Sequence, residues 1–115
     1  TDLLGTWVRD RKVLTLEQAV HKLTKVQADL FRFTDRGELR VGAHADVVVF
    51  DPATVGTGPV RRVKDFPADG ERLTADSPTG MVLTFVNGHK IVENGTLTAD
   101  ALSSRPGELL APAPR

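Results

Sequence analysis

The sequence predicts an α+β chain of 115 residues, with helices in its first third and short, mostly antiparallel strands after them. Apolar residues in the first 34 positions recur at helical spacing, whereas residues 47–50 form an unbroken apolar run with high β preference. The Asn87-Gly88 pair between two apolar segments is the strongest short-range signal for a β-hairpin. We therefore divide the chain into helices over 1–34, a β-rich part over 35–100, and an irregular tail over 101–115, which is rich in proline and small residues.

Three short helices are predicted in the N-terminal part. The first covers 2–11, where four apolar side chains stand at helical spacing. The second begins after Thr15, because Thr15 and Gln18 have the spacing of a capping box. Thr24 and Gln27 repeat that spacing, which predicts a third helix that ends near residue 31.

Val47–Phe50 is the strongest strand signal in the chain. An apolar run of this length is typical of a strand that is covered on both faces. The strand should end by Asp51, because Pro52 lacks the N–H group that a ladder needs. Upstream, Glu38–Val41 alternates polar and apolar residues and predicts another short strand, with a turn over 42–44.

Residues 53–80 are predicted to form a long irregular loop, because glycines and prolines interrupt every periodic pattern there and charged residues fill the remainder. Strands return at Met81–Val86 and over 90–93, joined by the Asn87-Gly88 turn. Asn94-Gly95 predicts a second turn, followed by one more short strand over 96–98.

Composition excludes several classes of function. Lysine and arginine number 15, and aspartate and glutamate also number 15, so no net charge attracts the chain to nucleic acid or to a membrane surface. No apolar run approaches the roughly 20 residues that span a bilayer, and charges in residues 1–15 exclude a signal peptide there. The absence of cysteine excludes disulfides and thiolate metal sites, and we expect a cytoplasmic protein.

Titratable residues predict no active site. His21, His44 and His89 share neither a helical i, i+4 face nor an H-x-H spacing, so they are read as surface residues and not as zinc ligands. Asp46 and Asp51 bracket a strand, but residues five apart face opposite sides of a strand and lie roughly 17 Å apart. Asp46 is predicted to accept backbone N–H groups at the entrance of that strand.

Nucleophile and phosphate-loop motifs are also missing. Ser77, Ser103 and Ser104 lack the G-x-S-x-G context of a nucleophile elbow. The stretch 56–59, Gly-Thr-Gly-Pro, lacks the lysine and the following helix of a phosphate loop. From the residues alone we assign no catalytic and no metal-binding residue, and the substrate-binding residues are unknown.

Two longer patterns resemble the C-terminal end of the amidohydrolase superfamily. The first is R-G-x-L-x-x-G-x-x-A-D-V-V-V-F-D-P over 36–52, and the second is V-N-G-x-x-x-V-x-x-G over 86–95. The helix over 16–24 resembles the last barrel helix of that superfamily. The segments 62–73 and 105–110 are similar to the N-acyl-D-amino-acid deacylases, or D-aminoacylases, although Gln27 stands where these relatives usually carry proline.

This resemblance implies a metal-dependent (β/α)₈ barrel with a small β-sandwich built from both ends of a long chain. Residues 1–34 would be terminal helices of the barrel, and residues 35–100 would be the C-terminal share of the sandwich. The parent enzyme would hydrolyse the amide bond of N-acyl-D-amino acids through zinc-activated water. Its zinc ligands and catalytic residues lie on barrel strands that this chain does not contain, so the chain alone is expected to bind no zinc and to be inactive.

The expected partners follow from the same resemblance. The missing catalytic barrel is the first, and the chain, which begins at Thr1 and not at methionine, would be a piece of that longer protein. Self-association is the second, because half of a β-domain leaves strand edges unpaired. An alternative reading is a free-standing small β-domain that acts as a binding module, with the basic loop within 53–80 as its contact.

Overall fold

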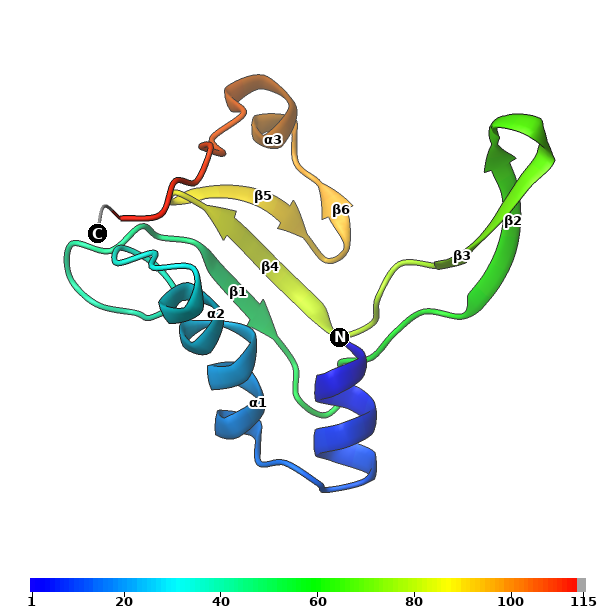
Figure 1. Ribbon diagram of the computed structural model, residues 1–115, viewed down its shortest axis with the longest axis horizontal. Helices are drawn as coiled ribbons and strands as arrows, with labels where there is room; N and C mark the ends of the chain where they lie inside the picture. The colour runs from blue at the N-terminus through cyan, green and yellow to red at the C-terminus, as the bar shows by residue number, and fades with distance from the viewer. Residues whose placement is uncertain (114–115) are drawn as a thin grey trace.

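A computed structural model describes residues 1–113, apart from the side chain of Phe66. Pro114 and Arg115, the end of the predicted tail, lie outside the described residues. Three N-terminal helices lie beside a four-stranded antiparallel sheet, and a two-stranded hairpin projects away from both (Figure 1). The α+β prediction is confirmed. Within residues 1–113 the strands form one four-stranded sheet and a separate two-stranded hairpin.

The three helices stand where the sequence predicts them, as η1 (Leu3–Asp10), α1 (Leu16–Leu23) and α2 (Lys25–Leu30). The first has the wider π-helical hydrogen bonding. The predicted capping box of α1 is confirmed: the Gln18 N–H donates to the Thr15 hydroxyl at 3.2 Å, and the Thr15 N–H donates to the Gln18 side chain at 3.0 Å. The second capping box is wrong, because the Thr24 hydroxyl instead donates to the carbonyl of Val20 at 2.8 Å.

The strands of the sheet are β1 (Val47–Phe50), β4 (Met81–Val86), β5 (His89–Glu93) and β6 (Thr96–Leu97). Their order in the sheet is β1-β4-β5-β6, and all pairs are antiparallel. The predicted turns are confirmed, since Asn87 and Gly88 have φ of 48° and 81°, and Asn94 and Gly95 have 48° and 79°. These left-handed conformations give two-residue connections whose twist matches that of the flanking strands.

Two predictions around β1 are wrong. The strand is not covered on both faces, because Val48 is 49% and Val49 is 41% exposed in the described part of the chain. The physical reason is that Val48 and Val49 point to opposite faces of the sheet, and the one element of the described residues that contacts β1 extensively is its neighbour β4, which lies in the plane of the sheet. Glu38–Val41 is irregular and not a strand: no strand pairs with it within residues 1–113, and Val41, where a turn begins, is fully exposed.

The predicted irregular loop over 53–80 is also wrong, because it contains a hairpin of β2 (Val60–Phe66) and β3 (Gly70–Ala75) joined by the short turn η2 (Pro67–Asp69). We call residues 60–75 the arm. Ion pairs between the two strands stabilise the arm. In one of them the Arg72 guanidinium donates two hydrogen bonds, of 2.8 and 2.6 Å, to the Asp65 carboxylate. The arm projects away from the main sheet (Figure 1).

The predicted irregular tail begins with a helix, α3 (Ala99–Ser104), which corrects the prediction for residues 101–104. Thr98 caps this helix, because its hydroxyl accepts the N–H of Ala101 at 3.2 Å. Thr98, a good N-cap residue, indicates this helix in the sequence. The prolines of the tail led to the prediction of an irregular segment instead. Residues 105–113 have no regular secondary structure, as predicted.

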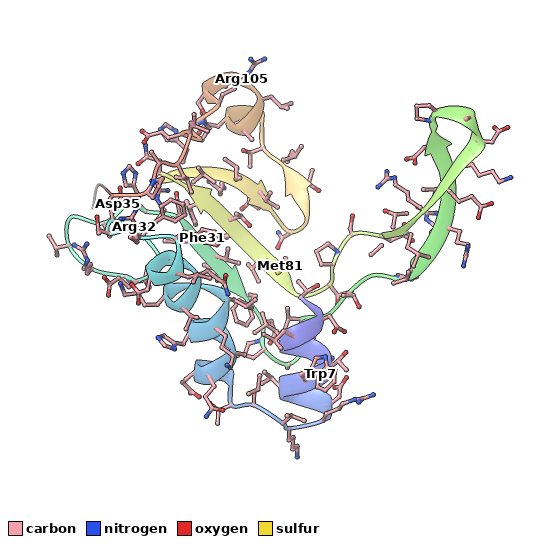
Figure 2. The ribbon with its side chains drawn as sticks, viewed as in Figure 1. Trp7, Phe31, Arg32, Asp35, Met81 and Arg105 are labelled. Atoms are coloured by element: carbon pink, nitrogen blue, oxygen red, sulfur yellow. The ribbon has the colours of Figure 1, made fainter. Side chains whose placement is uncertain are left out.

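The core is small and lies where the helices meet the ends of β1 and β4. Leu4, Ala19 and Val55 form it, and Phe50 and Met81 pack against it from the sheet. Figure 2 shows Met81 at the start of β4, on the side of the sheet near η1. This arrangement joins the helices, the sheet and the base of the arm at one point.

Candidate functional site

The junction around Val55 determines where the arm leaves the body of the protein. Val55 is fully buried, and its carbonyl accepts a hydrogen bond of 2.5 Å from the Arg9 guanidinium of η1. The Asp51 N–H donates to the Gly80 carbonyl at 2.9 Å, which joins the end of β1 to the start of β4. Gly80 has a φ of +68°, and a Cβ there would lie 2.6 Å from the Cα of Val55. The junction therefore depends on glycine for both its conformation and its close packing.

Asp51 stabilises the turn that leads into this junction. Its carboxylate accepts the Ala53 N–H at 2.9 Å and the Thr54 hydroxyl at 2.8 Å. These two hydrogen bonds lower the pKa of Asp51 below its ordinary value of 3.8. The role is structural, because the carboxylate is occupied by its own turn.

Asp46 performs the predicted role at the other end of β1. Its carboxylate accepts the Asn87 N–H at 2.8 Å and an N–H of the Arg36 guanidinium at 2.6 Å. The Gly88 N–H donates to the Ala45 carbonyl at 3.0 Å beside it. The predicted backbone hydrogen bond is confirmed, whereas the sequence reading missed Arg36. Together these bonds attach the β4–β5 turn to the chain that enters β1.

The histidines lie apart, each with its own local contacts or none. His44 lies next to this turn, with Nδ1 3.2 Å from the Asn87 side-chain oxygen and Nε2 3.3 Å from the Asp35 carboxylate. His89 begins β5 and lies 3.2 Å from Asp100, and His21 is exposed on α1. No group of three or more His, Asp or Glu residues that could hold a metal ion occurs in the part that the structure describes. The histidines and carboxylates of residues 1–113 therefore do not converge in the way that the ligands of a zinc ion do.

The remaining candidates are structural as well. The hydroxyls of Ser103 and Ser104 donate to backbone carbonyls within α3, and Ser77 lies in the chain between β3 and β4. Gly56 of the glycine-rich stretch forms an isolated bridge with Thr79 at the base of the arm. Asp46 and Asp51 lie at opposite ends of β1 and do not form a carboxylate pair. None of these side chains belongs to an arrangement that activates a nucleophile.

A groove of about 460 Å³ lies between α1 and the sheet at β1. Its lining is mostly apolar and lacks a cluster of converging polar groups, which a catalytic pocket needs. It suits the burial of another apolar element. The apolar side chains that line it are Leu4, Val20, Leu23, Leu39, Val47, Val48, Phe50 and Met81. Among the described residues, no helix is both long enough and apolar enough to cross a membrane.

Comparison with known proteins identifies the family. The Amidohydrolase family matches residues 1–92. The chain belongs to the amidohydrolase family. Over 96% of its length it is 40% identical to the N-acyl-D-glutamate deacylase of Alcaligenes xylosoxydans xylosoxydans, of which it covers 20%. This amidohydrolase chain thus spans about a fifth of the length of the curated relatives it matches.

Solved structures agree with this assignment. The amidohydrolase chain is similar to a crystal structure of D-aminoacylase, with a TM-score of 0.64 and 32% identity over 84% of this chain and 18% of that one. It is similar to the N-acyl-D-glutamate deacylase of Bordetella bronchiseptica, with a TM-score of 0.60 and 40% identity over 78% of this chain and 17% of that one. That enzyme was crystallised with zinc and a phosphonate inhibitor that mimics the tetrahedral intermediate. The resemblance to N-acyl-D-amino-acid deacylases is confirmed.

Proposed function

We propose that this chain is a part of a longer zinc-dependent amidohydrolase that hydrolyses the amide bond of N-acyl-D-amino acids. The observation that carries this proposal is the match over nearly the whole chain to a deacylase of which it represents a fifth. The zinc and the groups that activate water belong to the other four fifths in this proposal. The chain itself then contributes no catalytic residue.

The role of this part is to pack against the remainder of the enzyme. The apolar groove beside β1 and the unpaired edge of that strand are the surfaces that we assign to this contact. A strand edge with free N–H and C=O groups binds further strands. Without the remainder, the same surfaces favour self-association of the chain.

A segment exchange tests this role. The segment of the related N-acyl-D-glutamate deacylase that aligns with this chain is replaced by residues 1–115, and hydrolysis of N-acyl-D-glutamate is measured with zinc present. We expect the chimera to be active and the isolated chain to be inactive. Turnover by the isolated chain would overturn the proposal that the catalytic residues lie outside this chain. An inactive but folded chimera would overturn the packing role.

Two valine substitutions make the exchange specific. Val48→Asp places a charge in the groove and should abolish the activity of the chimera, because an unpaired charge that becomes buried costs several kcal/mol. Val41→Asp makes the same change at a fully exposed position and should leave the activity close to that of the chimera. Equal effects of the two substitutions would contradict a packing surface at β1.

The arm favours a second candidate function, a free-standing binding module. Its two strands pair with each other and leave both outer edges open, and the side chains of Arg62 and Lys64 are 75% and 65% exposed. The mass of the natural polypeptide distinguishes the two functions. A natural protein of 115 residues would favour the module, and a product several times longer would favour the enzyme.

A further inference from the structure

The chain contains two Asn-Gly turns with the same backbone conformation and different surroundings. Asn87-Gly88 connects β4 and β5, and Asn94-Gly95 connects β5 and β6. The φ angles are 48° and 81° in the first turn and 48° and 79° in the second. All four residues are exposed. The two turns therefore form an internal comparison in which local sequence and backbone shape are matched.

Asn-Gly pairs are the sequences in which an asparagine amide is most readily lost, because glycine places no side chain in the way of the reaction. The Gly backbone nitrogen loses its proton and forms a bond to the Asn Cγ, the bond from Cγ to the amide nitrogen breaks, and that nitrogen leaves as ammonia. Water then opens the resulting succinimide at one of its two carbonyls. The products are an aspartyl residue and an isoaspartyl residue, whose backbone runs through the side chain.

In the first turn, both reacting groups are held by hydrogen bonds. The nucleophile is engaged because the Gly88 N–H donates to the Ala45 carbonyl at 3.0 Å. The electrophile is engaged because the Asn87 side-chain oxygen lies 3.2 Å from Nδ1 of His44. The backbone N–H of Asn87 donates to the Asp46 carboxylate at 2.8 Å. This contact does not distinguish the two turns, because the backbone N–H of Asn94 donates to the Val82 carbonyl, also at 2.8 Å. The Asn87 amide cannot approach the Gly88 nitrogen until the first two contacts open.

In the second turn, neither reacting group is held. Within residues 1–113, the Asn94 side chain and the Gly95 N–H have no hydrogen-bond partner, and no atom lies within 4 Å of the place where a Gly95 Cβ would stand. The turn ends in β6, which has only two residues and lies at the edge of the sheet. Short edge elements open locally at low free-energy cost. The succinimide geometry is therefore accessible at Asn94.

We propose that Asn94 is a site of spontaneous deamidation and isoaspartate formation in this protein, and that Asn87 is protected by its hydrogen bonds to the β1 entrance. The isoaspartyl product lengthens the backbone of the turn. Because hairpin register depends on turn length, it disrupts the pairing of Glu93 with Thr96 and of Val92 with Leu97. The product also makes the chain a substrate for the class of methyltransferases that esterify isoaspartyl carboxylates.

Peptide mapping of the full chain tests the proposal. The protein is incubated in warm, mildly alkaline buffer, and tryptic cleavage after Lys90 places the two turns in different peptides. Mass spectrometry measures the loss of each amide with time, and methyl transfer by an isoaspartyl methyltransferase detects the isomer. We expect Asn94 to react on the order of tenfold faster than Asn87, the factor expected if two hydrogen bonds must first open at Asn87.

Two controls separate structure from sequence. In denaturant the two rates should become similar, because only the local Asn-Gly sequence then remains. His44→Ala should raise the rate at Asn87 several-fold and leave the rate at Asn94 unchanged, since it frees the Asn87 amide. Equal rates in native buffer would overturn the proposal, as would a tenfold preference for Asn94 that persists in denaturant.

Discussion

Gly80→Ala tests whether the junction at Val55 holds the molecule together. Gly80 has a φ of +68°, and its added Cβ would lie 2.6 Å from the Cα of Val55, 2.7 Å from the carbonyl carbon of Thr54 and closer still to the Val55 nitrogen. These are backbone atoms, which cannot rotate aside as a side chain does. The left-handed conformation costs an L-residue about 1–2 kcal/mol, and overpacking costs typically about 1–3 kcal/mol. We therefore expect the free energy of unfolding to fall by about 2–5 kcal/mol.

Such a loss is large against the total stability of a small domain, which is about 5–15 kcal/mol. Urea unfolding measures it, followed by circular dichroism and by the fluorescence of Trp7, the single tryptophan, which lies on η1 (Figure 2). The slope of the transition must stay constant for the comparison to report stability alone. A variant that is unfolded without denaturant would agree with the upper part of the expected range.

Gly95→Ala is the matched control. Gly95 has a φ of +79° and nothing within 4 Å of its added Cβ. It carries the conformational cost of about 1–2 kcal/mol without the overpacking. The difference between the two variants isolates the close approach of Gly80 to Val55. If both variants lose the same free energy, the packing argument for the junction is refuted.

Three further outcomes follow from the same contacts. Val48→Asp in the isolated chain should lower the free energy of unfolding by only about 1 kcal/mol, because the side chain is 49% exposed, and an unfolded variant would contradict an exposed β1. Acid should destabilise the chain through Asp51, because the pKa of this carboxyl is lower in the folded chain than its ordinary value of 3.8. The stability that results is fully present at a pH above the ordinary pKa and is lost as the pH falls through the folded pKa. Asp51→Asn should therefore show a smaller drop in melting temperature than the parent chain between neutral pH and about pH 2–3. Light scattering with size exclusion should show species above 12.4 kDa that grow with concentration and decrease in Val48→Asp, whereas a monomer at high concentration would exclude self-association.

The features that the sequence predicts well are those encoded by neighbouring residues. The capping box of Thr15 and Gln18 lies within one turn of helix, and the Asn-Gly pairs need only their own left-handed conformations. Asp46 is a similar case, since a carboxylate at a strand entrance has backbone donors at hand. Its second partner, Arg36, comes from ten residues away, and nothing in the local pattern indicates that contact.

The two strands of the arm could not be predicted from the periodicity of apolar residues. Its residues form a ladder in which Arg72 binds Asp65, and Arg62 and Lys64 both approach Glu71. Cross-strand charge pairs stabilise a hairpin by the same direct opposition as apolar pairs. Charge pairs of this kind produce no alternation of apolar and polar residues in the sequence. The stretch 53–80, which has mixed charges and several glycines and prolines, therefore has the sequence pattern of a loop. The register, which only the structure provides, reveals the pairing.

The prediction that β1 is covered on both faces fails for a different reason. Its four residues are those of a covered strand, yet the outer edge of β1 is open and Val48 and Val49 are exposed. Edge strands that face water in natural proteins are usually interrupted by charges, proline or inward-pointing polar residues, and β1 has none of these between Asp46 and Asp51. The composition of the strand and its surroundings in this chain therefore disagree. An additional apolar element over the groove beside β1 would remove the disagreement, and the span of this chain, about a fifth of its relatives, leaves ample sequence in a longer enzyme to supply one.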